Sequence, residues 1–320
     1  LARGQYGKQG GLLMGRIKSF VAIGLLVVTG VWGSWAWGLF RSEPTAADSP
    51  TAPPEIGRMV RLAGGPFRMG NDLANDPAER PAHEVFLSPL LIDEHEVTNR
   101  QFAQFVAQTG MHTTAQQRGW SYVFDRNEQE WVRCDGADWR HPGGPDTSLD
   151  GRDDSPVVHV SWYDATAYAR WSGKQLPTEA QWEYAARSGL RDANFPWGRE
   201  ERIDGRYQAN YRQHGKDPWA DGFEGLAPVK SYPASRFALY DMSGNVWEWC
   251  ADRYGEDYYG TGPREDPAGP DEGPLRVIRG GSWLSPENYC LGHHVSTRGK
   301  RPAEETSQHV GFRCVRSAER

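Results

Sequence analysis

An uncharged apolar segment near the N-terminus constrains the fold of this chain more than any other feature. Residues 20–40, FVAIGLLVVTGVWGSWAWGLF, contain no charged side chain. About 20 apolar residues at a rise of 1.5 Å each span the roughly 30 Å hydrocarbon core of a bilayer. A cleaved signal peptide, the competing interpretation, usually has a shorter apolar region. We therefore predict a single N-terminal transmembrane helix over residues 20–40 that acts as a signal anchor.

The charges around this segment predict its orientation. Basic side chains precede it and acidic ones follow it, namely Arg3, Lys8, Arg16 and Lys18, then Glu43 and Asp48. Since positive flanks stay on the cytoplasmic side, residues 1–19 should form a short cytoplasmic N-terminus. We predict a single-pass protein of the cytoplasmic or inner membrane, with its C-terminal domain on the extracytoplasmic, periplasmic side.

The remaining chain divides into a tether, one domain and a short tail. Residues 41–57 are rich in Pro, Ala, Ser and Thr and predict a semi-extended linker. Residues 58–316 carry most of the aromatic side chains, which bury large apolar areas, and residues 317–320 form the tail. Lys and Arg number 36 against 42 Asp and Glu, so the formal charge is −6. This balance argues against nucleic acid as a partner.

Capping signals predict three helices within the domain. The helical segments begin after Thr98, Ser161 and Thr178 and end at Gly110, Gly173 and Gly189. Strand patterns predict a hairpin over residues 59–69 that turns at 64–66, and another strand over residues 85–92. Residues 111–156 and the chain after Phe195 should be mostly loops with short strands. The pattern indicates an irregular α+β fold.

Eight motifs occur in order along the domain. They are GGPFRMG (64–70), ERPAHEV (79–85), IDEHEVTNRQF (92–102), PVVHVSWYDATAYARWSGKQLPTEAQWEYAARSG (156–189), FPWG (195–198), YDMSGNVWEWCAD (240–252), RVIRGGSW (276–283) and GFRC (311–314). Together they closely resemble the formylglycine-generating enzyme family, also called sulfatase-modifying factors. The resemblance implies a loop-rich C-type-lectin-like fold over residues 58–316. It also implies oxidation of a cysteine in a client protein, such as a sulfatase, to formylglycine.

One position departs from the family pattern at the implied catalytic site. Enzymes of this family use oxygen and a copper(I) ion held by two cysteine thiolates, five positions apart after the GGS[WY] motif. Here the second position is Cys290, and the first is Ser285. Copper(I) is a soft ion that prefers thiolate, whereas a serine hydroxyl is a poor ligand for it. Ser282 and Trp283 lie next to this position and should line the same cleft.

Three interpretations of the departure remain open. In the first, Ser285 makes a turn and Cys290 is a small buried core residue. In the second, His293 or His294 joins Cys290 in a rebuilt metal site. In the third, an altered oxidation proceeds through Cys290 alone.

The resemblance also implies two structural calcium sites. Calcium is a hard ion that takes oxygen ligands. The first site matches the side chains of Asn210 and Asp221 and the carbonyls of Tyr211 and Phe223. The second matches the side chains of Asp241 and Glu248 and the carbonyls of Gly244 and Val246. Family members often have Asn at the position of Asp241, so the carboxylate here should strengthen cation binding.

Three classes of function remain. The first is a membrane-anchored formylglycine-generating oxidoreductase that modifies a client protein. The second is a non-catalytic relative that binds a peptide or glycan as a scaffold. The third is a relative with different chemistry, such as the sulfoxide-synthase group, but the HxxxHxE segment of that group does not occur here. Four cysteines, Cys134, Cys250, Cys290 and Cys314, allow three full pairings that the sequence does not rank.

Overall fold

The computed structural model describes residues 57–213, 217–285 and 293–318. The chain forms two compact units, residues 1–49 and 50–320, and the first lies wholly outside the described residues. The predicted anchor over residues 20–40 and residues 41–56 of the linker therefore lie outside them too. Among the described residues, no helix is both long enough and apolar enough to cross a membrane.

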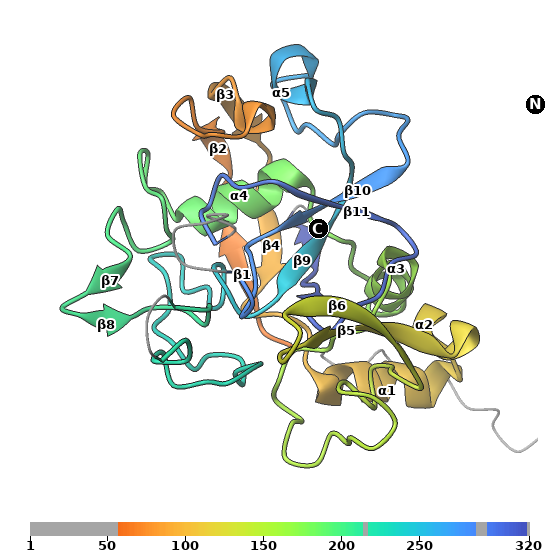
Figure 1. Cartoon of the computed structure of the whole chain (residues 1–320). Coiled ribbons are helices and arrows are strands. Elements are labelled where there is room, and N and C mark those ends of the chain that lie inside the picture. Colours follow the sequence, from red (N-terminus) through yellow and green to blue (C-terminus); the bar gives the residue numbers. More distant parts are fainter. Residues whose placement is uncertain (1–56, 214–216, 286–292, 319–320) are drawn as a thin grey trace, which may run out of the picture. The chain divides into compact units, whose positions relative to one another are not determined.

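Two small sheets organise the described unit (Figure 1). The larger has the strand order β11-β10-β9-β12, with strands β9 (Trp247–Arg253), β10 (Leu275–Arg279), β11 (Gly299–Pro302) and β12 (Val310–Gly311). Its pairs are antiparallel except that β12 runs parallel to β9. The second has the order β1-β4-β13, with strands β1 (Met59–Leu62), β4 (Leu90–Asp93) and β13 (Val315–Ser317). Both sheets therefore join segments that are far apart in the sequence.

Three two-stranded ribbons complete the strands. They are β2 (Gly65–Met69) with β3 (His83–Leu87), β5 (Trp120–Asp125) with β6 (Glu130–Asp135), and β7 (Arg202–Ile203) with β8 (Arg206–Tyr207). The predicted hairpin over residues 59–69 is wrong, because β1 pairs with β4 and β2 pairs with β3. The predicted strand over residues 85–92 is two strands, β3 and β4, that belong to different sheets.

The three predicted helices are confirmed. They are α1 (Asn99–Thr109), α3 (Trp162–Trp171) and α4 (Glu179–Arg187), and each begins with a complete capping box. The short elements α2 (Thr114–Arg118), α5 (Tyr258–Thr261) and the 3-10 turn η1 (Pro77–Glu79) were not predicted. The α2 helix and the β5–β6 ribbon lie in the region predicted to be mostly loops, residues 111–156.

Aromatic side chains hold this irregular chain together. Phe102 of α1 lies 6.0 Å from Tyr168 of α3 between ring centroids, and Phe312 lies 5.3 Å from Tyr168. All three are fully buried. Trp182 of α4 and Trp249 of β9 are also fully buried, so α4 packs against the larger sheet. Large rings thus supply the apolar burial that few regular elements could supply by themselves.

Candidate functional site

A tight turn follows β10 and presents the residues of the GGSW motif. The Ser285 Oγ accepts the Ser282 N–H at 2.9 Å, and the Ser285 N–H donates to the Ser282 carbonyl at 2.8 Å. The Arg212 N–H donates to the Ser285 carbonyl at 3.1 Å. Ser285 is 4% exposed and Trp283 is 1% exposed. Ser285 is therefore a buried part of a hydrogen-bonded turn.

This geometry does not fit a two-thiolate copper(I) site. The side chain at position 285 is a hydroxyl, which stays protonated near neutral pH and already accepts a backbone hydrogen bond. Copper(I) binds soft sulfur ligands in preference to such an oxygen. Cys290 lies outside the described residues. The turn interpretation of Ser285 agrees with the structure, whereas the environment of Cys290 stays open.

His309 joins the turn from the neighbouring strand region. Its Nδ1 lies 3.3 Å from the Ser282 Oγ, and its ring lies 4.3 Å from Trp131 between centroids. Burial lowers the pKa of His309 to about 3, so the imidazole is neutral at pH 7. His309 is not among the site residues predicted from the sequence. It reaches the turn because β12 runs parallel to β9, with the Trp247 N–H donating to the His309 carbonyl at 2.9 Å.

An open cleft of about 520 Å³ lies beside the turn, with Trp283 and Gln308 among its walls. The guanidinium of Arg126 lies 5.1 Å from the Trp219 ring and 5.2 Å from the Trp283 ring. Arg126 also donates to the Glu224 carbonyl and lies 3.4 Å from the Glu224 carboxylate. The cleft thus combines an exposed cation and polar groups above a nearly buried tryptophan. Such a surface suits a peptide segment.

His293 is buried and packed among aromatic rings, and its Nδ1 has no hydrogen-bond partner among the described residues, so the rebuilt metal site stays a prediction. Its ring is 1% exposed and stacks on Tyr211 at 4.5 Å between centroids. Its Nε2 lies 3.3 Å from Glu201 Oε1. The neighbouring His294 has its pKa lowered to about 4 by burial. Within the described residues, no three His, Cys, Asp or Glu side chains converge as a metal-binding group.

Three of the four residues of the first calcium prediction contact one another, namely Tyr211, Asp221 and Phe223. Asp221 accepts the Tyr211 N–H at 2.9 Å and the Phe223 N–H at 3.2 Å through its two carboxylate oxygens. Asn210 is 1% exposed and donates to the Gly225 carbonyl at 2.8 Å. Its Oδ1 is buried and accepts no hydrogen bond within the described structure. An unpaired buried amide oxygen suits a cation, but the two Asp221 oxygens already accept backbone N–H groups, so the first calcium site stays a prediction.

The second predicted site contains an unusual concentration of buried acid. Glu248 is fully buried, and its carboxylate binds Arg313 through two contacts of 2.7 Å. Burial, with Glu248 nearby, raises the pKa of Asp241 to about 6. Glu96 is also fully buried, its oxygens accept no hydrogen bond from described donors, and burial beside Asp241 raises its pKa. Two fully buried carboxylates and the half-buried Asp241 therefore lie around one guanidinium, and the second calcium site stays a prediction.

Glu96 was not predicted as a site residue, because nothing in its local sequence pattern separates it from a surface acid. The backbone segments of the two predicted calcium sites also contact each other. The Asn245 N–H donates to the Asn210 carbonyl at 2.8 Å. Gly244 packs so closely against that carbonyl that a Cβ would collide with it. Gly244 also has φ 77°, so a side chain there would be strained.

The cysteines of the described chain are unpaired. Cys134, Cys250 and Cys314 are free thiols, and the last two are fully buried. Burial raises the pKa of both thiols well above the ordinary range. Neither is therefore an activated thiolate.

The chain is similar in sequence to a family model and to several named relatives. The family model described as "Sulfatase-modifying factor enzyme 1-like domain" matches residues 45–318. The formylglycine-generating enzyme of Thermomonospora curvata is 44% identical over 288 residues, covering 82% of this chain and 95% of that protein. The inactive C-alpha-formylglycine-generating enzyme 2 of Mus musculus is 39% identical, covering 82% and 86%. The family thus includes relatives named as enzymes and relatives named as inactive.

A solved structure shares the fold. PvdO from Pseudomonas aeruginosa aligns with a TM-score of 0.64 and 27% identity over 82% of this chain and 94% of that one. The mixed α/β fold expected from the eight motifs is therefore confirmed, together with the family resemblance. This chain belongs to the sulfatase-modifying factor family.

Proposed function

We propose that this protein binds an extended segment of a client protein in the cleft beside Ser282 and Trp283, without the two-thiolate copper(I) oxidation of its relatives. The observation that carries the proposal is Ser285. Its hydroxyl replaces a thiolate and is buried in a hydrogen-bonded turn. Loss of one of two soft ligands removes most of the affinity for copper(I), whereas the cleft walls do not depend on it.

The cleft offers the side chains that typically anchor a peptide. Arg126 and Trp283 line the cleft, with Trp219 near both, and arginine and tryptophan dominate binding energy at protein interfaces. The neutral imidazole of His309 supplies a further polar group near Ser282. A sulfatase segment is the first client to test, because relatives of this chain are named as formylglycine-generating enzymes.

A second candidate function is oxidation of a client cysteine to formylglycine by this chain. It is favoured by the 44% identity to the Thermomonospora curvata enzyme over nearly its whole length, and by the presence of Cys290. In that case Cys290, alone or with His293, would replace the usual pair of thiolates.

The cellular setting is part of the same proposal. Residues 20–40 anchor the protein in the cytoplasmic or inner membrane, and the domain faces the periplasm. Calcium ions hold the loops around Asn210, Asp221, Asp241 and Glu248. The partners are then a client protein and the membrane, with no role for nucleic acid.

The test uses the full chain in detergent with fluorescein-labelled, cysteine-containing sulfatase peptides. Fluorescence anisotropy should show saturable binding, and mass spectrometry after incubation with copper(I) and oxygen should show no aldehyde. Arg126→Ala should weaken peptide binding by about tenfold, because it removes the exposed guanidinium of the cleft and its packing against the tryptophans. The matched control is Arg140→Ala, because Arg140 is also exposed and lies 4.5 Å from the Trp139 ring outside the cleft. Aldehyde formation would establish the second candidate, and no binding would contradict both.

A further inference from the structure

Two walls of the cleft come from parts of the chain that are far apart in the sequence. One contains Trp283 of the GGSW turn, and the other contains residues 224–226, directly before Ala227. On the open side Arg126 joins them, because its guanidinium lies 5.2 Å from the Trp283 ring and 3.4 Å from the Glu224 carboxylate. The Arg126 side chain is 42% exposed, so this contact by itself fixes the width of the cleft only weakly.

The side chain of Asn245 holds one of these walls from the buried side. Asn245 is 1% exposed, its Oδ1 accepts the Ala227 N–H at 3.1 Å, and its Nδ2 donates to the Ala227 carbonyl at 3.3 Å. The same Oδ1 accepts a second hydrogen bond from the Asn210 amide at 3.1 Å, and that amide also donates to the Gly225 carbonyl at 2.8 Å. Buried amides thus hold the backbone on both sides of Leu226.

The backbone of Asn245 holds the other wall. Its carbonyl accepts the Trp283 N–H at 2.9 Å, and its N–H donates to the Asn210 carbonyl at 2.8 Å. The residue has φ 58°, in the left-handed region that asparagine adopts more readily than most residues other than glycine. One residue therefore binds both walls, since its backbone binds Trp283 and its side chain binds Ala227.

The side-chain contacts with Ala227 require an acceptor and a donor at the end of one short side chain. An asparagine amide supplies both, an ionised aspartate supplies only the acceptor, and glycine supplies neither. Glycine would nevertheless adopt the positive φ without strain and keep both backbone hydrogen bonds. The substitution Asn245→Gly therefore removes the side-chain contacts alone.

We propose that Asn245 is a positioning residue that sets the separation of the two walls of the cleft, through its backbone contact with Trp283 and its side-chain contacts with Ala227. Asn245 is buried, and it acts through these neighbours rather than by touching a client segment. The inference rests on the proposed function, since it names the residue that prepares the cleft for that segment. Walls that are held in place before binding lower the entropic cost of binding, so the affinity for a client depends on Asn245.

Isothermal titration calorimetry tests the inference, with a sulfatase peptide titrated into the full chain in detergent. Asn245→Gly should raise the Kd by about tenfold, because residues 225–227 must then be ordered when the peptide binds. A residue that served stability alone would change the folded fraction, and thus the stoichiometry of the titration, but not the Kd. An unchanged Kd for Asn245→Gly would overturn the inference.

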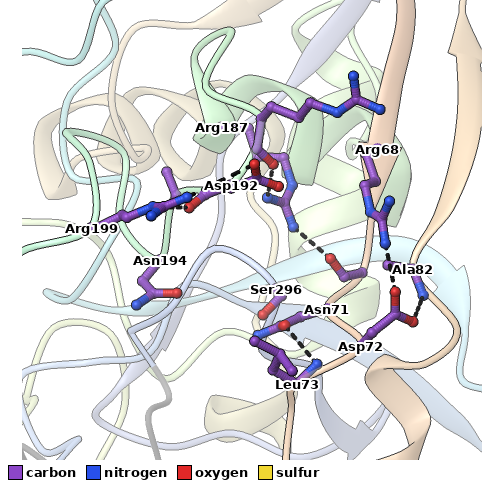
Figure 2. A pocket seen from close by; sticks show the side chains of 13 residues that line it. Arg68, Asn71, Asp72, Leu73, Ala82, Arg187, Asp192, Asn194, Arg199 and Ser296 are labelled. Carbon is purple, nitrogen blue, oxygen red and sulfur yellow. Dashed lines mark hydrogen bonds and ion pairs between the residues drawn. The ribbon is translucent and has the colours of Figure 1, made fainter.

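The matched control is Ser188→Gly. Ser188 is likewise buried, has φ 48°, and uses its hydroxyl to contact the Ala185 carbonyl and the Ser235 hydroxyl. It directly follows Arg187, which lines a separate pocket of about 500 Å³ that shares no lining residue with the cleft (Figure 2). Ser188→Gly should therefore leave the Kd for the peptide unchanged, and an equal rise in both variants would also overturn the inference.

Hydrogen exchange separates failure of this inference from failure of the proposed function. Without peptide, Asn245→Gly should speed amide exchange at Ala227 by at least about tenfold, whereas Trp283 keeps its partner and should exchange as in the unmodified chain. If the unmodified chain bound no peptide, the proposed function would be contradicted, and exchange at Ala227 would still test the role of Asn245. Unchanged exchange at Ala227 would overturn the inference whether or not the peptide binds.

Discussion

Replacing Arg313 with leucine should destabilise the domain strongly. Arg313 is fully buried and holds both oxygens of Glu248 at 2.7 Å. It also donates to the Tyr240 carbonyl at 2.9 Å and to the Asp241 carbonyl at 3.3 Å. Removal leaves the Glu248 carboxylate buried without its counter-charge, beside the acids Glu96 and Asp241.

The expected magnitude follows from the cost of an uncompensated buried charge. Breaking such a pair by removing one partner costs about 3–5 kcal/mol, which is a large share of the roughly 5–15 kcal/mol that stabilises most domains. At roughly 2–4 °C per kcal/mol for a domain near this size, the Tm should fall by about 6–20 °C. Replacing Arg313 and Glu248 together by leucine should recover much of the loss, because no charge is then stranded.

The assay is urea unfolding of the detergent-solubilised chain, followed by tryptophan fluorescence. The matched control is Arg100→Leu, since Arg100 contacts Asp153 and Asp154 at 3.4 and 3.0 Å but all three side chains are more than half exposed. This control should lose less than about 1 kcal/mol. If Arg313→Leu cost no more than Arg100→Leu, the description of a charge-dependent buried cluster would be refuted.

Two further predictions concern pH and calcium. His159 is fully buried between the Ser121 hydroxyl and the Pro142 carbonyl, and burial lowers its pKa to about 4. The folded state therefore favours the neutral ring. Its contribution to the free energy of unfolding is complete above the unfolded pKa of about 6.5 and is lost as the pH falls toward 4. The loss amounts to up to about 3 kcal/mol. His159→Gln should flatten the fall in unfolding free energy over that range, and parallel curves for the two proteins would be inconsistent with this. Calcium at 100 times its Kd should raise the Tm by roughly 5–10 °C. Asn210→Ala should remove much of that rise, whereas Asn127→Ala, at an exposed position, should not. An equal rise in the unmodified protein and both variants would argue against the first calcium site.

Local signals predicted the helices because a cap and its helix are close in sequence. Thr98 and Thr178 each have Gln at the third helical position, and both capping boxes form as the pattern indicates. The prediction of strand pairing failed because the partners of a strand can lie far away in the sequence. Strand β1 could pair with the adjacent β2, but Leu62 lies opposite Leu90 instead, in a different sheet from β2. Nothing within residues 59–69 distinguishes these two partners.

The site was predictable where a whole motif surrounds each residue. Asp221 contacts the backbone of Tyr211, which the resemblance places in the same site, and Ser285 lies at the GGSW turn. Glu96 and His309 were missed because their importance comes only from tertiary position. The Glu96 carboxylate accepts no hydrogen bond among the described residues, and burial lowers the pKa of His309. Both are properties of the folded environment.

The most direct test of the central claim is copper(I) titration of the purified chain beside a Ser285→Cys variant. We predict that the unmodified protein binds no copper(I) tightly, because its described turn offers a hydroxyl where relatives offer a thiolate. The Ser285→Cys variant should gain stoichiometric, tight binding that a further Cys290→Ala change abolishes. Tight stoichiometric binding by the unmodified chain, lost in Cys290→Ala, would contradict the account and establish a rebuilt copper site.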